Sequence, residues 1–238
     1  MNGTRESIIL CEGYHDRAFW KGWLLHRFGC VEARAAKATW RFRGVYTYQT
    51  PAGALLHVVP CESDRDVLQQ AADTLGEVAR KPLSRLVVNL DVDLRQPEDR
   101  CKAIEGSIRG SGHPMTQIAE GDWKLGDTLV SALLWHVPDP VPAGAPEPQT
   151  LERLACAALC AVYPERGEAV RTWLQSRPEP SRAKEHKAIA WTHMAGWYAG
   201  QGCDAFYTCL WTDPPVAAEL ERLLRATSAW QVAEALVT

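Results

Sequence analysis

Two short apolar runs that end abruptly in acidic residues constrain this chain most. The runs cover residues 6–11 and 83–90, and the acidic residues that follow them are Glu12, Asp16, Asp91 and Asp93. Apolar runs of this length between polar flanks predict buried strands of a parallel sheet. Because ligands bind at the carboxyl ends of the strands in such sheets, we expect the four carboxylates to meet at one edge.

Four carboxylates at one point repel one another unless a cation holds them. Mg²⁺ and Mn²⁺ prefer oxygen ligands, so one of these ions is the expected cofactor. The predicted metal ligands are therefore Glu12, Asp16, Asp91 and Asp93. The simpler alternative is that an acidic residue just after a strand caps the following helix, and this alternative applies most directly to Asp16.

The two motifs together resemble the TOPRIM domain of topoisomerases, primases and certain nucleases. That family has a strand ending in Glu-Gly, an Asp three residues beyond the Gly in its nuclease-like branches, and a later strand ending in Asp-x-Asp. The matching residues are Glu12-Gly13, Asp16 and Asp91-Val92-Asp93, and the resemblance covers residues 5–137. It implies a mostly parallel α/β sheet flanked by helices, two metal positions for phosphodiester hydrolysis, and a role for Glu12 as metal ligand or general acid/base.

Phosphodiester hydrolysis also needs positive charge beside the phosphate oxygens, which become more negative in the transition state. The overcoming-lysogenization-defect nucleases, to which the chain is most similar within the family, place a Lys near the metals from a later segment. Its candidate counterparts are Lys184 and Lys187, with Arg182 beside them as a nucleic-acid contact. A second basic stretch, interleaved with Trp40 and Phe42, is suited to follow a phosphate backbone and consists of Arg34, Lys37, Arg41 and Arg43. A solvated helix or strand face is the alternative for both.

Strands and helices alternate up to residue 137, which is typical of a layered α/β fold. The predicted strands are 6–11, 40–48, 54–60, 83–90 and 128–137, and the helices between them are 15–28, 64–80 and 97–108. Residues 138–149 are a proline-rich linker, which favours an extended and semi-rigid chain. The helices expected after it are 150–162, 166–176, 183–200, 202–210 and 214–236. We therefore expect a TOPRIM-like α/β domain at 1–137, a linker at 138–149, and an α-helical extension or subdomain at 150–238.

Composition excludes several classes of protein. The net charge of −3 argues against a general nucleic-acid coating protein, although a local basic patch can still hold phosphate. The polar first residues and the lack of an apolar stretch near 18 residues lead us to expect a cytoplasmic protein without a membrane partner. The eight cysteines form no Cys-x-x-Cys pair, which favours reduced thiols over a zinc site.

The function expected from these features is divalent-metal-dependent phosphodiester hydrolysis on nucleic acid, DNA or RNA. The chain has no P-loop motif, so we expect either a solitary enzyme or one that works with a separate ATPase partner. Two alternatives remain open. One is a non-catalytic TOPRIM-fold module that binds nucleic acid or protein, and the other is a metal-dependent phosphatase or nucleotidyl transferase acting on a small substrate.

Overall fold

The computed structural model describes residues 5–33, 38–112, 114–142, 144–177, 185–197 and 203–238. The strands are β1 (Glu6–Cys11), β2 (Val31–Glu32), β3 (Tyr46–Gln49), β4 (Leu55–Pro60), β5 (Arg85–Asp91), β6 (Thr116–Ala119), β7 (Asp122–Leu125) and β8 (Thr128–Trp135). The helices are α1 (Tyr14–His26), α2 (Asp64–Gly76), α3 (Pro97–Gly110), α4 (Leu151–Val162), α5 (Pro164–Gln175), α6 (Glu185–Trp197), α7 (Cys203–Cys209), the short 3₁₀ helix η2 (Leu210–Thr212), α8 (Pro214–Arg225) and α9 (Ala229–Val237).

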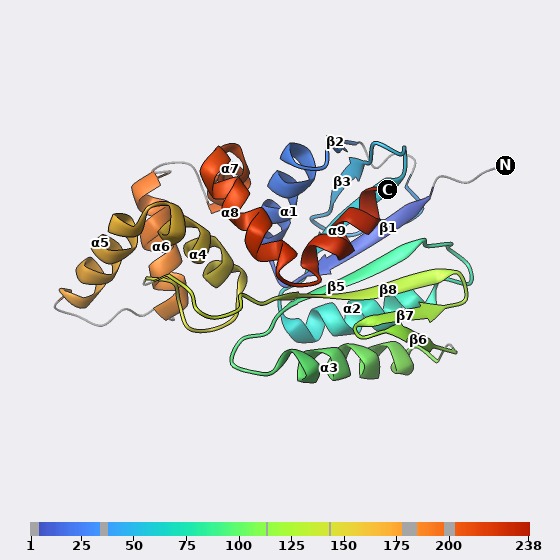
Figure 1. Cartoon of the computed structure of the whole chain (residues 1–238). Helices are drawn as coiled ribbons and strands as arrows, with labels where there is room; N and C mark the ends of the chain where they lie inside the picture. Colours follow the sequence, from blue (N-terminus) through green and yellow to red (C-terminus); the bar gives the residue numbers. More distant parts are fainter. Residues whose placement is uncertain (1–4, 34–37, 113, 143, 178–184, 198–202) are drawn as a thin grey trace.

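The strands form one mixed sheet in the order β2-β3-β4-β1-β5-β8-β7-β6. Its four central strands, β4, β1, β5 and β8, are parallel, and antiparallel strands extend it at both edges. The predicted mostly parallel α/β sheet flanked by helices, with a helical C-terminal part, is confirmed (Figure 1). Four carboxyl ends therefore lie side by side along one edge of the sheet.

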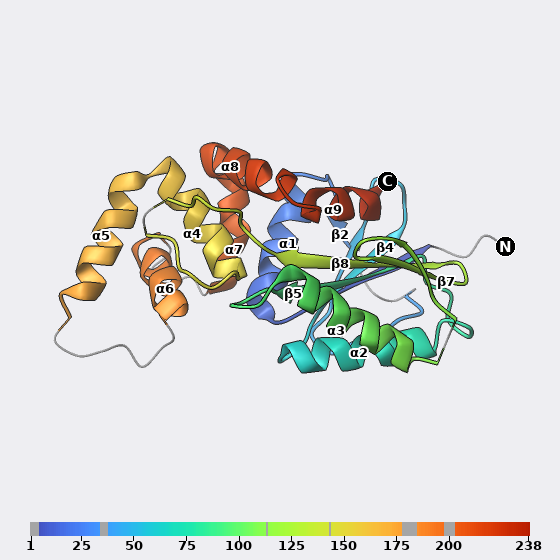
Figure 2. The same cartoon turned by 60° about the horizontal axis from the view of Figure 1, so that its bottom comes forward.

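Alternate residues of each buried strand face opposite layers of helices. In β1, Ile9 and Cys11 join a cluster with α1, α4 and α7–α9, whereas Ile8 and Leu10 join a second cluster with α2 and α3. Because side chains along a strand alternate with period two, a continuous apolar run is needed where both faces are covered. Figures 1 and 2 show α1, α8 and α9 on one face and α2 and α3 on the other.

Several predicted boundaries shift for identifiable reasons. The predicted strand 40–48 is reduced to β3, because the N–H groups of Thr39 and Trp40 donate to the carboxylate of Glu6 and Gly44 then turns the chain at φ 68°. The strands β2, β6 and β7 are not in the prediction, and they are only two to four residues long. The predicted helix 214–236 is two helices, α8 and α9.

The proline-rich segment 138–149 is tied down by the helix that follows it. Arg153 of α4 is almost fully buried, and its guanidinium donates to the carbonyls of Pro146 and Glu147 and to the carboxylate of Asp139. The side-chain amide of Gln149 exchanges hydrogen bonds with the backbone of Val137. These contacts place α4–α6 beyond the carboxyl ends of the central strands, as both views show (Figures 1 and 2). No helix among the described residues is long and apolar enough to cross a membrane.

The helix α1 approaches the C-terminal part closely at Gly22. A Cβ added there would lie 2.5 Å from the Trp211 side chain and 2.6 Å from the carbonyl oxygen of Thr208.

We expect Gly22→Ala to lower the free energy of unfolding by about 1–3 kcal/mol, because it overpacks a tight contact. Urea denaturation measures this change. The matched control is Gly76→Ala at the end of α2, where a Cβ meets nothing within 4 Å. The control should be neutral or stabilising by about 0.4–1 kcal/mol. Equal effects of the two substitutions would contradict the tight contact.

Candidate functional site

Glu12 and Asp91 lie side by side at the carboxyl ends of the paired strands β1 and β5. The backbone N–H of Asp91 donates to Glu12 Oε1 at 2.9 Å. Burial raises the pKa of Glu12 to about 7, although the hydrogen bond from Asp91 opposes this effect and the charge of Asp16 adds to it. A carboxyl group of this kind exchanges protons near neutral pH.

Asp16 reaches the same edge from the first turn of α1. Its side chain is buried, and Oδ1 accepts a hydrogen bond of 2.5 Å from the indole N–H of Trp135, the last residue of β8. Burial is the main reason why the pKa of Asp16 is raised to about 6, and the nearby carboxylate of Glu152 raises it further. Asp16 therefore does not act as a simple solvent-exposed helix cap.

Asp91 connects this edge of the sheet to the helical part. Its Oδ1 accepts a hydrogen bond of 3.0 Å from the backbone N–H of Leu151, the first residue of α4. Burial raises the pKa of Asp91 well above its ordinary value, and the carboxylates of Asp16, Glu12 and Glu152 raise it further. The structure thus brings Glu12, Asp16 and Asp91 together, as the positions of their strands predict.

Glu152 is a fourth carboxylate at this edge that the sequence reasoning missed. It is buried in the first turn of α4, and its Oε1 lies 3.8 Å from His15 Nδ1 on α1. Burial raises the pKa of Glu152, but the interactions with His15, with its own backbone N–H and with the charge of Lys187 are the main causes that lower it to about 2. The signal available in the sequence was the charged pair Glu152-Arg153 at the start of an otherwise apolar helix.

Asp93 makes different contacts from the other three predicted ligands. It has a left-handed backbone (φ 58°), and its carboxylate pairs with the buried guanidinium of Arg100 at 2.6 Å. The same guanidinium pairs with Asp64 of α2 at 2.8 Å. Arg100 therefore holds Asp93 at the rim of the site, although the negative charge of Asp93 still raises the pKa of Glu12.

The predicted basic residues fall into three groups. Lys187 of α6 is half-buried and lies close enough to Glu152 to lower the pKa of that carboxyl group. Arg41 and Arg43 are exposed beside the buried Trp40. The other predicted contacts, Lys184, Arg182, Arg34 and Lys37, lie outside the described residues.

The donor atoms at this edge fit a hard cation chemically. Carboxylate oxygens are the ligands that Mg²⁺ and Mn²⁺ prefer. The hydroxyl of Tyr207 on α7 is also buried, and it has no hydrogen-bond partner among the described residues. Burial and the carboxylates of Glu152, Asp16 and Asp91 raise the pKa of Tyr207, which places it beside them. Within the described part of the chain, no three His, Cys, Asp or Glu side chains are already placed to hold a metal ion. Side-chain rotation would therefore have to accompany binding.

The raised pKa of Glu12 gives a pH-dependent prediction. Below about pH 4.5 the carboxyl group is protonated in the folded and the unfolded chain, so Glu12→Gln should change little. Above pH 7 the folded chain carries the cost of a buried charge, so Glu12→Gln should stabilise it by about 1–3 kcal/mol. Melting temperatures measured in EDTA from pH 4 to pH 8.5 check this.

The control substitution is Asp127→Asn, an exposed residue at the opposite edge of the sheet, before β8. Asp127→Asn should leave the difference between the melting temperatures at pH 4 and pH 8.5 as it is in the wild type. A Glu12→Gln variant that is no more stable than the wild type at pH 8.5 would show that Glu12 is not a buried carboxyl group with a raised pKa.

No family model matches this chain, and a search of curated proteins found no match. Among solved structures, the chain is similar to the crystal structure of hypothetical protein PH0156 from Pyrococcus horikoshii OT3. The TM-score is 0.74 at 15% sequence identity, and the similarity covers 99% of this chain and 100% of that one. At this identity the similarity supports the fold alone, namely the α/β sheet together with its helical C-terminal part. The resemblance to the TOPRIM family stays a prediction.

Proposed function

We propose that this protein hydrolyses phosphodiester bonds in nucleic acid with a divalent cation, Mg²⁺ or Mn²⁺. One observation carries the proposal: the carboxylates of Glu12, Asp16 and Asp91 are gathered at adjacent strand ends, beside the ionised Glu152. Gathering like charges in a buried place costs stability, and such arrangements are concentrated at functional sites. Oxygen-bound divalent cations serve phosphodiester hydrolysis in many enzymes.

Glu12, Asp16 and Asp91 would hold the cation, with Glu152 near enough to join them. When bound, the cation supplies positive charge that stabilises the phosphate oxygens as the ester bond breaks. If Asp16 and Asp91 hold the cation without it, Glu12 is placed to accept the proton of the attacking water. Lys187 adds positive charge beside Glu152.

His15 has the position expected of a proton donor to the leaving oxygen. Its Nδ1 faces Glu152 Oε1 at 3.8 Å, and its ring stacks on Tyr207 with 5.0 Å between the ring centroids. A carboxylate at this distance orients the imidazole ring. Glu152 therefore acts on the reaction through His15 as well as through its own charge.

The first experiment measures cleavage of labelled single- and double-stranded DNA and RNA in Mg²⁺, Mn²⁺ or EDTA. We expect cleavage only with a divalent cation. Asp91→Asn should reduce it about 100-fold or more, the scale of losing one group of the reacting centre. Glu152→Gln should reduce it about 10- to 100-fold, as expected for a supporting carboxylate. Asp127→Asn is the control and should cleave like the wild type. Full cleavage by Asp91→Asn would exclude the assigned site.

A non-catalytic module that binds nucleic acid or a partner protein is the second candidate. The ion pair between Asp93 and Arg100 favours it, because this pair neutralises one of the predicted ligands. Isothermal titration with Mn²⁺ distinguishes the two functions. A binding module should show the same weak Mn²⁺ binding for the wild type and Asp91→Asn, and no cleavage with any cation. The proposed enzyme should lose most of its Mn²⁺ binding in Asp91→Asn.

A further inference from the structure

A cavity of about 400 Å³ opens beside the candidate site, over the segment that precedes β3. Sites for small ligands usually measure ~300–1,000 Å³, so this cavity has room for one nucleotide unit and excludes a base-paired duplex. The residues of its lining that matter here are Trp40, Arg41, Phe42, Arg43, Cys61 and Lys81.

Two aromatic rings form the apolar part of this cavity. The rings of Trp40 and Phe42 are parallel to within 1°, with 6.2 Å between their centroids. The indole N–H of Trp40 is buried and has no hydrogen-bond partner among the described residues. Trp40 is only 4% exposed, so the accessible flat face belongs to Phe42, which is partly exposed and stacked on Trp40. An aromatic face of this kind is suited to a planar ring such as a nucleobase.

Positive charge lies along the same wall. Arg41 and Arg43 alternate with the two aromatic residues and are exposed, and no ion pair with either occurs among the described residues. The ammonium group of Lys81 lies 5.1 Å from the centroid of the Trp40 ring and is paired with Glu77. The guanidinium groups of Arg41 and Arg43 would lie near the phosphates of a base on the rings. The same lining also carries three carboxylates, those of Asp66, Asp73 and Glu77.

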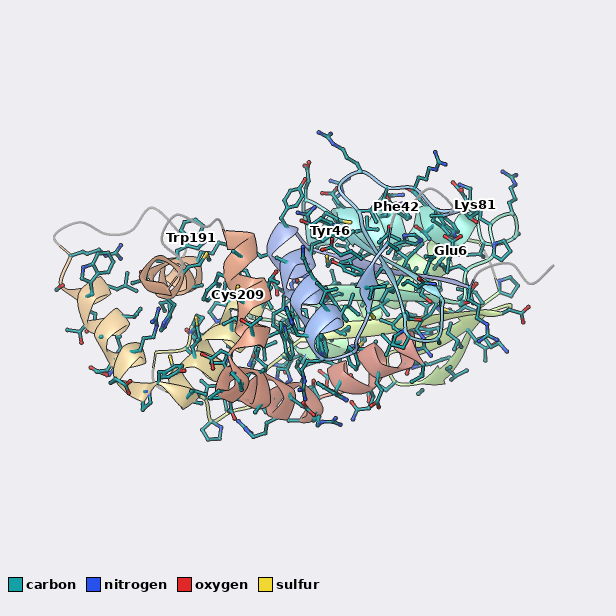
Figure 3. The ribbon with its side chains drawn as sticks, turned by 90° about the horizontal axis from the view of Figure 1, so that it is seen from above. Glu6, Phe42, Tyr46, Lys81, Trp191 and Cys209 are labelled. Atoms are coloured by element: carbon teal, nitrogen blue, oxygen red, sulfur yellow. The ribbon has the colours of Figure 1, made fainter. Side chains whose placement is uncertain are left out.

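The wall is held in place before any ligand arrives. The carboxylate of Glu6 accepts hydrogen bonds from the backbone N–H groups of Thr39 and Trp40 at 2.8 and 3.3 Å, and from His57 Nε2 at 3.0 Å. Figure 3 shows Glu6, Phe42 and Lys81 at the same end of the molecule, far from Trp191. Fixing the aromatic wall in advance lowers the entropic cost of binding.

One end of the cavity reaches the edge of the sheet that carries the carboxylates. Cys61 lines the cavity directly after β4, and its backbone N–H donates to the carbonyl of Cys11 at 2.7 Å. Cys11 directly precedes Glu12. The Cys61 end of the cavity is therefore one strand away from Glu12, whereas Trp40 lies toward the start of β1, where Glu6 holds it. The chain of a nucleic acid that runs along the cavity can extend from the rings toward the carboxylates.

We propose that this cavity binds an unpaired base of a single-stranded nucleic acid, with the base on Phe42, which is stacked on Trp40, and the phosphates on Arg41 and Arg43. The inference rests on the proposed function, because it assigns the substrate of the same site to single strands. Bases inside a duplex are stacked and paired, so they cannot reach a pocket of this size without leaving the helix.

The test measures binding without cleavage. Fluorescence anisotropy in EDTA compares a labelled ten-nucleotide single strand with its duplex, for the wild type and for Phe42→Ala. Stacking of one base on an aromatic ring contributes ~1–3 kcal/mol, so Phe42→Ala should weaken single-strand binding about 5- to 150-fold. Phe42→Leu keeps the apolar volume and should weaken binding similarly, which separates loss of stacking from loss of folding. Circular dichroism confirms that each variant is folded.

Matched controls lie far from the cavity. Trp173→Ala removes an exposed aromatic residue from α5, and Arg109→Ala removes an exposed charge from the end of α3. Neither should change the affinity for the single strand by more than about twofold. The double substitution Arg41→Ala and Arg43→Ala should weaken binding and reduce its dependence on salt concentration, because fewer counterions are released.

Three results would overturn the inference: no single-strand binding at low salt, equal affinity for single strand and duplex, or unchanged binding by Phe42→Ala and Phe42→Leu. These results are distinct from failure of the proposed hydrolysis. Single-strand binding that depends on Phe42, without cleavage in any cation, would support this cavity and reject the enzymatic function. Cleavage that depends on Asp91 but not on Phe42 would support the enzymatic function and reject this cavity as the site for the base.

Discussion

Asp91 connects the two parts of this protein through two hydrogen bonds. Its backbone N–H binds Glu12 at the end of β1, and its carboxylate accepts the N–H of Leu151 at the start of α4. One acidic residue therefore links two neighbouring strand ends to the start of the first C-terminal helix. That helix brings Glu152 to the same edge, where it faces His15. Asp91 thus joins the carboxylates of the sheet to the one that the helical part supplies.

Two buried arginines hold the surroundings of this connection. Arg100 pairs with Asp93 and Asp64, and Arg153 ties the proline-rich segment to α4. Burying a cation is costly unless it is paired and hydrogen-bonded, so each guanidinium requires its partners to stay in place. The geometry around the acidic edge is therefore set by charge pairing. The apolar layers further from the edge set the overall packing.

Five tryptophan side chains pack together in the cluster on the α1 side of the sheet. Trp20 and Trp23 of α1, Trp135 of β8, and Trp211 and Trp230 of the C-terminal part belong to one buried cluster. The rings of Trp23 and Trp211 are stacked at 5.5 Å, next to the close contact at Gly22. Most tryptophans are thus core residues, as expected for large rings that bury much apolar area. Trp40 differs because it belongs to the opposite cluster and also lines the cavity.

The sequence by itself indicated the central strands and the meeting of Glu12, Asp16 and Asp91, because short, continuously apolar runs favour buried parallel strands, whose carboxyl ends lie at one edge. It also indicated the aromatic and basic character of the segment around Trp40. Only the tertiary structure decided that Glu152 joins the acidic edge and that Asp93 turns to Arg100. Both outcomes depend on contacts between residues far apart in the chain, such as Asp91 with Leu151 and Asp64 with Arg100. Local patterns of apolar and polar residues carry no information about such pairs, because the same pattern is compatible with many arrangements of the helices.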